Sequence, residues 1–269
     1  MSAPLIDSHC HLDFPDFETD LDDVLARARE AGVTRFLTIC THVSKFDQVR
    51  HLAETHDTIH CTVGIHPHNA ETEPDVDAAQ LIAFAEHPKV AGFGETGLDY
   101  FYDRAPREIQ KRQFRAHIKA ARQTGLPVVI HTRDADADMA EILTEEMGKG
   151  AFPGLLHCFS SGPELARTAV DLGLYISLSG IVTFNKAEDL RGIIRGLPVD
   201  RLLVETDCPY LAPVPRRGKR NEPAFVAYTA EKLAEIMDMS VEDMARATTA
   251  NFYRLFGAKI PAPSDGAAA

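Results

Sequence analysis

Short apolar runs alternate with longer amphipathic stretches along almost the whole chain. The apolar runs have the length of β-strands, and the stretches between them repeat their hydrophobic positions at helical spacing. We count eight strand-length runs: Leu5–His9, Arg35–Cys40, Ile59–Gly64, Val90–Glu95, Pro127–His131, Gly154–His157, Tyr175–Leu178 and Arg201–Glu205. Eight successive strand–helix units predict a closed α/β barrel of the TIM, or (β/α)8, type.

Local signals place several of the helices. Leu21–Ala31 follows Asp20, a favoured N-cap residue, and Arg107–Thr124 ends directly before Gly125, which suits the left-handed conformation after a helix. Beyond the eighth run the chain predicts two extra C-terminal helices, Ala224–Met237 and Val241–Phe256.

The barrel accounts for most of the 269 residues. A barrel of this type takes about 250 residues, so we expect a single domain over residues 1–257 and a disordered tail over residues 258–269. An open, doubly wound sheet is the alternative. Such a sheet has a Gly-rich phosphate loop after its first strand, whereas the segment SHCHLDF contains no glycine.

Composition narrows the class of protein. No run of about 18 apolar residues occurs, and the N-terminal segment MSAPLIDSHC carries no basic region or long apolar leader. We therefore expect a soluble, cytoplasmic protein without a membrane partner, and a monomer is the simplest oligomeric state. Five cysteines without a CxxC pair argue against a disulfide framework and a structural zinc knuckle.

The formal net charge of −12 is unlike that of proteins that coat nucleic acids, because such binding relies on clustered lysines and arginines. A nuclease is still compatible with this charge. Bound metal ions neutralise phosphate locally, and acidic ligands add to the negative count until the metals bind.

Six side chains of the kinds that bind metal ions lie at the ends of five predicted strands. They are His9, His11, Glu95, His131, His157 and Asp207. Because the carboxyl ends of barrel strands share one face, we expect these groups to converge. Imidazole and carboxylate groups bind zinc and other divalent ions, so the set predicts a metal-dependent hydrolase.

Two members of this set are also candidates for catalysis. Glu95 has two oxygens that can bridge two cations, and Asp207 can accept a proton from a nucleophilic water and return it to the leaving group. Ordinary roles compete with each assignment. Glu95 could cap the following loop, as could Asp99 and Asp103, while Asp207 could precede a turn and the histidines could be core or strand-end polar groups.

Three further residues are candidates for contact with substrate: His66, Glu205 and Arg220. His66 follows the third strand and could bind phosphate or assist proton transfer, although His68 competes for that role. Glu205 could also orient a ligand from behind. Arg220 belongs to a basic cluster with Arg216, Arg217 and Lys219, which either guides a phosphate backbone or is a solvated loop.

These segments together resemble the TatD-like family of metal-dependent hydrolases, a branch of the amidohydrolase barrel group. The resemblance extends from Leu5 to about Phe256. It rests on eight segments in order: DSHCHLD, GIHPH, GETGLDY, PVVIHTRDAD, LLHCFS, SGIVTFNKA, LLVETDCPYL and the RNEP that ends at Pro223.

The resemblance implies a 3′-to-5′ exonuclease or related phosphodiesterase that acts on DNA and uses two divalent ions, Mg, Mn or Zn. It assigns one ion to His9, His11, Glu95 and Asp207, and the other to Glu95, His131 and His157. In this assignment, which the resemblance implies, Glu95 would bridge the two ions. The chain departs from the family at Ser161, where glycine is usual, and it has no pattern for the carboxylated lysine found in many other amidohydrolases.

Two other functions are compatible with the same residues. The metal centre could hydrolyse a non-nucleic-acid ester, amide or lactone, because it activates water whatever the electrophile. Alternatively, the barrel could be a catalytically silent binding protein with a structural metal. A ligand set that leaves room for water disfavours this last function.

Overall fold

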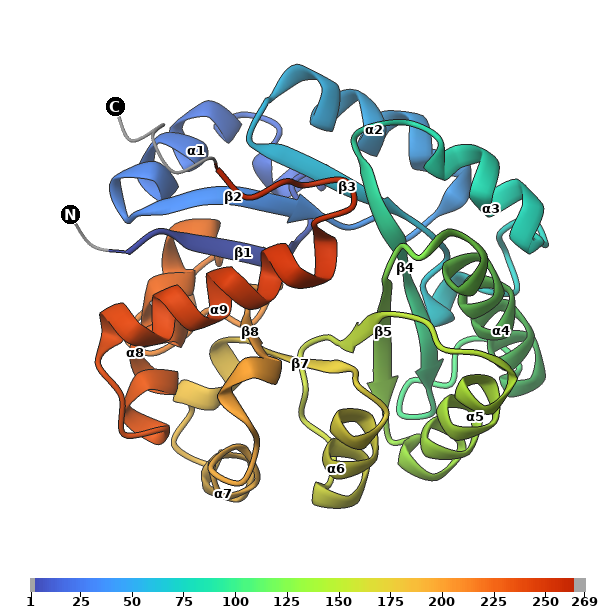
Figure 1. The fold of residues 1–269 in the computed structure, drawn as a ribbon. Coiled ribbons are helices and arrows are strands. Elements are labelled where there is room, and N and C mark those ends of the chain that lie inside the picture. The colour runs from blue at the N-terminus through green and yellow to red at the C-terminus, as the bar shows by residue number, and fades with distance from the viewer. Residues whose placement is uncertain (1–2, 264–269) are drawn as a thin grey trace.

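The protein is a barrel of eight parallel strands, seen in a computed structural model that describes residues 3–263 (Figure 1). Each strand pairs with the next in chain order, and a bridge between Cys10 and Cys208 brings the last strand region back to the first. This arrangement confirms the predicted fold. The strands are β1 (Leu5–Cys10), β2 (Val33–Thr38), β3 (Ile59–Val63), β4 (Val90–Asp99), β5 (Val128–Arg133), β6 (Gly154–Leu156), β7 (Tyr175–Leu178) and β8 (Leu202–Val204).

Helices connect the strands and surround them on the outside, as Figure 1 shows. Within residues 3–263, none is long and apolar enough to cross a membrane. The helices are α1 (Leu21–Glu30), α2 (Phe46–Thr55), α3 (Ala78–Ala85), α4 (Arg107–Thr124), α5 (Asp136–Lys149), α6 (Pro163–Asp171), α7 (Glu188–Ile194), α8 (Val226–Ile236) and α9 (Val241–Phe256).

The sequence predicted helix ends well where a nearby residue, such as a glycine directly after the helix, marks the end. The bounds of α4 and α9 agree with the prediction, and Gly125 after α4 has a φ of +74°. Asp20 precedes α1, but its side chain does not cap that helix. The helix predicted from Ala224 begins later, because a 3-10 turn precedes α8.

The largest difference in the sheet is the length of β4. This strand continues to Asp99, four residues beyond its predicted end at Glu95, and its last part pairs with β5. Gly97 permits the pairing: it has a φ of +141°, and a Cβ there would lie 2.0 Å from the carbonyl oxygen of His131. The extension places Asp99 at the carboxyl end of the barrel, beside Arg133 at the end of β5.

Apolar side chains fill the interior of the barrel and meet α9. On β5 and β6, Val129 and Leu155 belong to this inner cluster, while their chain neighbours pack toward the outer helices. The strand residues contact a set from the C-terminal segment, namely Phe252, Leu255, Phe256 and Ile260. Helix α9 therefore closes one end of the barrel (Figure 1).

The ordered chain extends past α9, which corrects the predicted tail. Ile260 is 1% exposed, and the Lys259 Nζ donates to the carbonyl oxygen of Ala85 at 3.0 Å. Disorder from residue 258 was therefore wrong for this first part, where burial against the barrel organises the chain. The rest of the tail prediction, residues 264–269, lies outside the described residues.

Candidate metal centre

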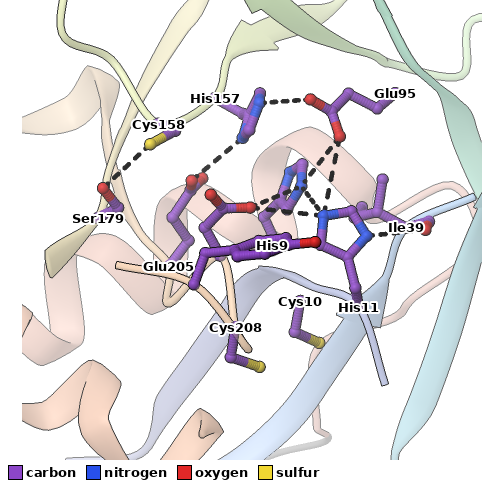
Figure 2. A network of polar contacts seen from close by, with 12 residues as sticks. His9, Cys10, His11, Ile39, Glu95, His157, Cys158, Ser179, Glu205 and Cys208 are labelled. Atoms are coloured by element: carbon purple, nitrogen blue, oxygen red, sulfur yellow. Dashed lines mark hydrogen bonds and ion pairs between the residues drawn. The ribbon is translucent and has the colours of Figure 1, made fainter. Parts of the chain in front are cut away.

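Histidines and carboxylates gather at the carboxyl ends of the strands, opposite α9. All six side chains predicted as metal ligands are brought together there, and Figure 2 labels His9, His11, Glu95 and His157 among them. His9 and His11, from β1 and the residue after it, direct their Nε2 atoms toward each other at 3.3 Å. Both rings are buried.

Glu95 lies in the middle of this cluster and divides it into two halves. Its Oε2 is 3.4 Å from the His9 Nε2 and 3.9 Å from the His11 Nε2. Its Oε1 is 2.7 Å from the His157 Nε2 and 2.9 Å from the His131 Nδ1. Figure 2 shows the two oxygens turned toward different partners. A bridging carboxylate between two cations has this arrangement.

Asp207 completes the half of the cluster that contains His9 and His11. Its Oδ1 is 3.4 Å from the His11 Nε2 and 3.6 Å from the His9 Nε2. The residue adopts a left-handed φ of +55°, which Asp tolerates better than most residues, and its N–H donates to the His9 carbonyl oxygen at 2.9 Å. This backbone hydrogen bond ties the loop after β8 to β1.

The donor set fits divalent metal ions. Three groups of side chains each offer donor atoms within 4.8 Å of one another: His9–His11–Asp207, His9–Glu95–His157 and His66–Glu95–His131. In the described part of the chain, the ion-pair partners of Glu95 and Asp207 are all histidines. Imidazole nitrogens and carboxylate oxygens that converge without a lysine or arginine are the ligands that such cations take.

The electrostatics of the cluster favour positive charge. Burial disfavours the charged Glu95 carboxylate, but the surrounding histidines, His157 first, outweigh it and hold the pKa of Glu95 well below its usual range. Burial likewise opposes charge on His157, yet Glu95 and Glu205 raise the pKa of that imidazole well above its usual range. Metal binding would replace the protons that these groups otherwise share.

Glu205 supports His157 from behind. Its Oε1 is 3.2 Å from the His157 Nδ1, so the opposite ring nitrogen points to Glu95. Glu205 is fully buried. This geometry fits the ligand-orienting role predicted for Glu205 and does not fit direct contact with a substrate.

Asp99 holds His131 in the same way, although its place in the sequence predicted no more than a possible loop cap. Its Oδ2 is 3.0 Å from the His131 Nε2 and 2.8 Å from the His68 Nε2. The available signal was its even spacing from Glu95, which places both side chains on one face if the strand continues. The predicted end of the strand at Glu95 hid this relation.

His66 joins the cluster itself. Its Nε2 is 3.3 Å from the Glu95 Oε1, and its ring lies 4.6 Å from that of His131. Burial lowers the pKa of His66 to about 4, so the imidazole is neutral near pH 7. His68, its competitor, is directed to Asp99 instead.

Arg220 is not brought to the cluster. Its guanidinium donates to both carboxylate oxygens of Asp20 at 2.9 and 2.7 Å and lies over the Phe17 ring. These contacts anchor the loop after β8 to the start of α1, and the substrate contact predicted at Arg220 stays a prediction. The cluster neighbours Arg216, Arg217 and Lys219 are exposed.

Ser161 lines a hollow of about 410 Å³ beside the ends of β5 and β6. Arg133 and Ser160 share this hollow. The residues that line this hollow, Arg133, Asp134, Asp136, Ser160, Ser161 and Gly162, include none of the six candidate ligands.

Comparison with known proteins gives consistent matches. The sequence model for "TatD related DNase" matches residues 6–257. An Escherichia coli K12 protein named "uncharacterized metal-dependent hydrolase YcfH" is 46% identical over 255 residues, which cover 94% of this chain and 95% of that protein. The "3′-5′ ssDNA/RNA exonuclease TatD" of Cronobacter turicensis is 35% identical over 246 residues, 89% of this chain and 93% of that protein. Among solved structures, the TatD homologue YJJV of Escherichia coli K12 matches with a TM-score of 0.88 and 32% identity, covering 97% of this chain and all of that one.

Proposed function

Since the chain belongs to the TatD-related DNase family of metal-dependent hydrolases, we propose that it removes nucleotides from the 3′ end of single-stranded DNA. The observation that carries this proposal is the position of Glu95, whose Oε2 faces His9 and His11 while its Oε1 faces His131 and His157. A pair of cations in such a centre suits phosphodiester hydrolysis, because attacking and leaving oxygens both need charge stabilisation. The exonuclease named among the relatives supports the direction of cleavage.

The two ions would be Mg, Mn or Zn, held by overlapping ligand sets. His9, His11 and Asp207 would hold one ion, His131 and His157 the other, and Glu95 would bridge them. When bound, the ions would polarise the phosphoryl group and lower the pKa of a water molecule. Mixed imidazole and carboxylate ligands accept each of these metals.

Asp207 is the residue that handles the proton. Its side chain is 14% exposed, against 3% for Glu95, so it is the carboxylate of the cluster that solvent reaches. Burial disfavours its charge, but the hydrogen bond to His11 and the nearby imidazoles outweigh burial and lower the pKa of Asp207. The ionised carboxylate can accept a proton from the attacking water and donate it to the leaving oxygen.

A non-nucleic-acid ester, amide or lactone is the second candidate substrate. The observation in its favour is the engagement of Arg220 with Asp20, which removes one cation from the rim where a phosphate backbone would pass. The same cluster would activate water for each of these electrophiles.

Cleavage of labelled DNA tests the proposal. Metal-stripped protein is reloaded with Mg, Mn or Zn and given single-stranded DNA labelled at the 3′ or the 5′ end, with Glu95→Ala in parallel. We expect metal-dependent release of 3′ nucleotides that is lost in the variant. If the loaded protein instead leaves DNA intact and hydrolyses an ester, amide or lactone in a Glu95-dependent way, the second candidate replaces the first.

A further inference from the structure

Exposed aromatic side chains gather at the end of the barrel that carries the metal cluster. Five large hydrophobic side chains are exposed in residues 3–263, and four of them belong to the loops after β4 and β8. The four are Phe101 (54% exposed), Tyr102 (48%), Tyr210 (55%) and Val214 (43%). Single exposed hydrophobic residues need no explanation, but a shared location at a cluster of candidate ligands does.

Phe101 and Tyr102 form a supported pair. Their rings meet edge to face with centroids 4.9 Å apart, and the Arg133 guanidinium lies 4.1 Å from the Phe101 centroid and 4.9 Å from the Tyr102 centroid. The Tyr102 N–H donates to the Asp99 Oδ1 at 2.8 Å. The pair is therefore held in place at its backbone and on its ring faces while about half of each side chain stays open to solvent.

The same Asp99 connects this pair to the metal cluster. Its other oxygen binds the His131 Nε2 at 3.0 Å, and the Tyr102 ring lies 5.2 Å from the ring of His68. The aromatic pair thus borders the half of the cluster that contains His131. A group bound on the pair would lie next to a phosphodiester held at the metals.

We propose that Phe101 and Tyr102, backed by Arg133, form a stacking site for an unpaired nucleobase. This inference rests on the proposed function and specifies its substrate: a strand whose terminal bases are free. Every base has a π face that stacks on an aromatic ring without regard to sequence, and arginine adds a cation–π contact. A base inside a duplex has both faces covered by its neighbours, so the site selects single strands.

The charge of the protein supports stacking as the source of affinity. A net charge of −12 repels a polyanion, and Arg220 is paired with Asp20. Apart from the exposed Arg216, Arg217 and Lys219, nucleic-acid binding therefore gains from a contribution that does not depend on basic side chains. An aromatic pair next to a charge-neutralising metal centre supplies one.

A cycle of protein and DNA changes tests the stacking site. Binding is measured in the Asp207→Asn background, so that the strand stays intact. Two oligonucleotides are compared. The normal strand carries 2-aminopurine, a base whose fluorescence falls on stacking, at its 3′ end, and the abasic strand has no base at that position. The double variant Phe101→Leu and Tyr102→Leu keeps the loop apolar but removes both rings. Tyr102→Phe keeps the ring, and Val241→Ala changes an exposed apolar residue outside these loops.

We expect the double leucine variant to bind the normal strand about 10-fold more weakly and to lose the fluorescence change. The abasic strand should bind the parent and the double leucine variant alike. Tyr102→Phe should retain the fluorescence change because it keeps the ring, and Val241→Ala should bind the normal strand as the Asp207→Asn parent does. Unchanged binding of the normal strand, or equal weakening for both strands, would overturn the stacking site.

Failure of the stacking site and failure of the proposed function give different results. If the double leucine variant with Asp207 intact cleaves single strands as the wild type does and binding shows no base dependence, the nuclease stands and the stacking site falls. If wild-type protein cleaves no DNA but binding still depends on the base and the rings, the stacking site stands without the nuclease. Loss of both cleavage and base dependence removes both.

Discussion

The two ends of the barrel differ in the side chains that the same strands place there: one end is apolar, and the other carries the candidate ligands. On β5, Val129 packs in the inner apolar cluster, and two residues later His131 joins the polar cluster. Leu155 on β6 and His157, directly after this strand, repeat the pattern. Positions two apart on a strand face the same side, so the side chains change from packing to chemistry within one inward-facing row. Apolar packing fills the end that α9 closes, and the other end carries the cluster of histidines and carboxylates.

Two buried carboxylates show the same contrast in charge balance. Glu146 on α5 is paired with Arg115, Arg122 and Lys149. Glu95 is surrounded by histidines. The framework carboxylate therefore has its countercharges in the chain itself, whereas the cluster carboxylate depends on protons or metal.

Exchanging each carboxylate for an amide should separate these roles, with the largest effect at Glu95. We expect Glu95→Gln to lose bound metal and to lower metal-dependent hydrolysis roughly 10³-fold or more, because the bridging charge is gone. The Glu146→Gln protein should keep the metal content of the wild type. Its unfolding free energy should fall by roughly 1–3 kcal/mol, because the three basic partners of Glu146 lose a charged acceptor. Metal analysis, hydrolysis rates and urea unfolding measure these changes. Full metal content in Glu95→Gln would contradict the bridging assignment.

The closed end of the barrel should respond in the opposite way. Phe256 is fully buried against the strand interior, so Phe256→Ala should lower the unfolding free energy by roughly 3–5 kcal/mol through lost burial and a cavity. Metal content per folded molecule should not change. Tyr253→Ala on the same helix, where the side chain is only half-buried, is the control and should cost less. A loss of metal in folded Phe256→Ala would show that the two ends are coupled.

The sequence predicted the elements that depend on local patterns, and it missed what depends on distant partners. Eight strands and the bounds of α4 follow from periodicity and Gly125. The full length of β4 requires pairing with β5, and without it Asp99 looks like a loop residue. Burial of Ile260 depends on strand residues that are distant in the sequence, such as Ile6, Leu37 and Ala91.

Candidate ligands were easier to predict than their surroundings. Six donors at strand ends converge in any closed parallel barrel, so topology alone brings them together. The partner of Arg220 is Asp20, about two hundred residues away in the chain, and the sequence contains no local sign of that ion pair. Contacts of this kind decide whether a charged residue meets substrate or anchors a loop.

A buried histidine outside the candidate metal centre should make the stability of the barrel depend on pH. His117 on α4 is fully buried, accepts the Ile65 N–H at its Nε2 and donates from its Nδ1 to the Gln113 carbonyl oxygen. Burial lowers the pKa of His117 to about 4 from a usual 6.5. Between these values the unfolded chain binds the extra proton, so stability is full above pH 6.5 and falls as the pH drops toward 4.

We expect this effect to remove about 2 kcal/mol of unfolding free energy between pH 7 and pH 5. Urea unfolding of metal-free protein at both pH values measures it, and His117→Gln should show a difference smaller by that amount. His51→Gln, at an exposed position on α2, is the control. An equal pH dependence in wild type and His117→Gln would mean that His117 does not carry the sensitivity.

The smallest effect is expected from the residue that orients one candidate ligand without joining the cluster. Asp99→Asn removes the negative charge and one of the two acceptor oxygens. The oxygen that remains can serve either His131 and His68, as Oδ2 does, or the Tyr102 N–H, as Oδ1 does. Loss of such a partner weakens metal binding by 10- to 100-fold, and the remaining amide oxygen argues for about 10-fold here. The weakening should fall on the ion held by His131, so a metal titration should show one affected step and one unchanged step. Asp103→Asn, where the carboxylate pairs with Arg107 at the surface, should titrate as the wild type does. Equal weakening of both steps in Asp99→Asn would mean that the two halves of the cluster, joined at Glu95, respond as one unit to a change at the His131 side.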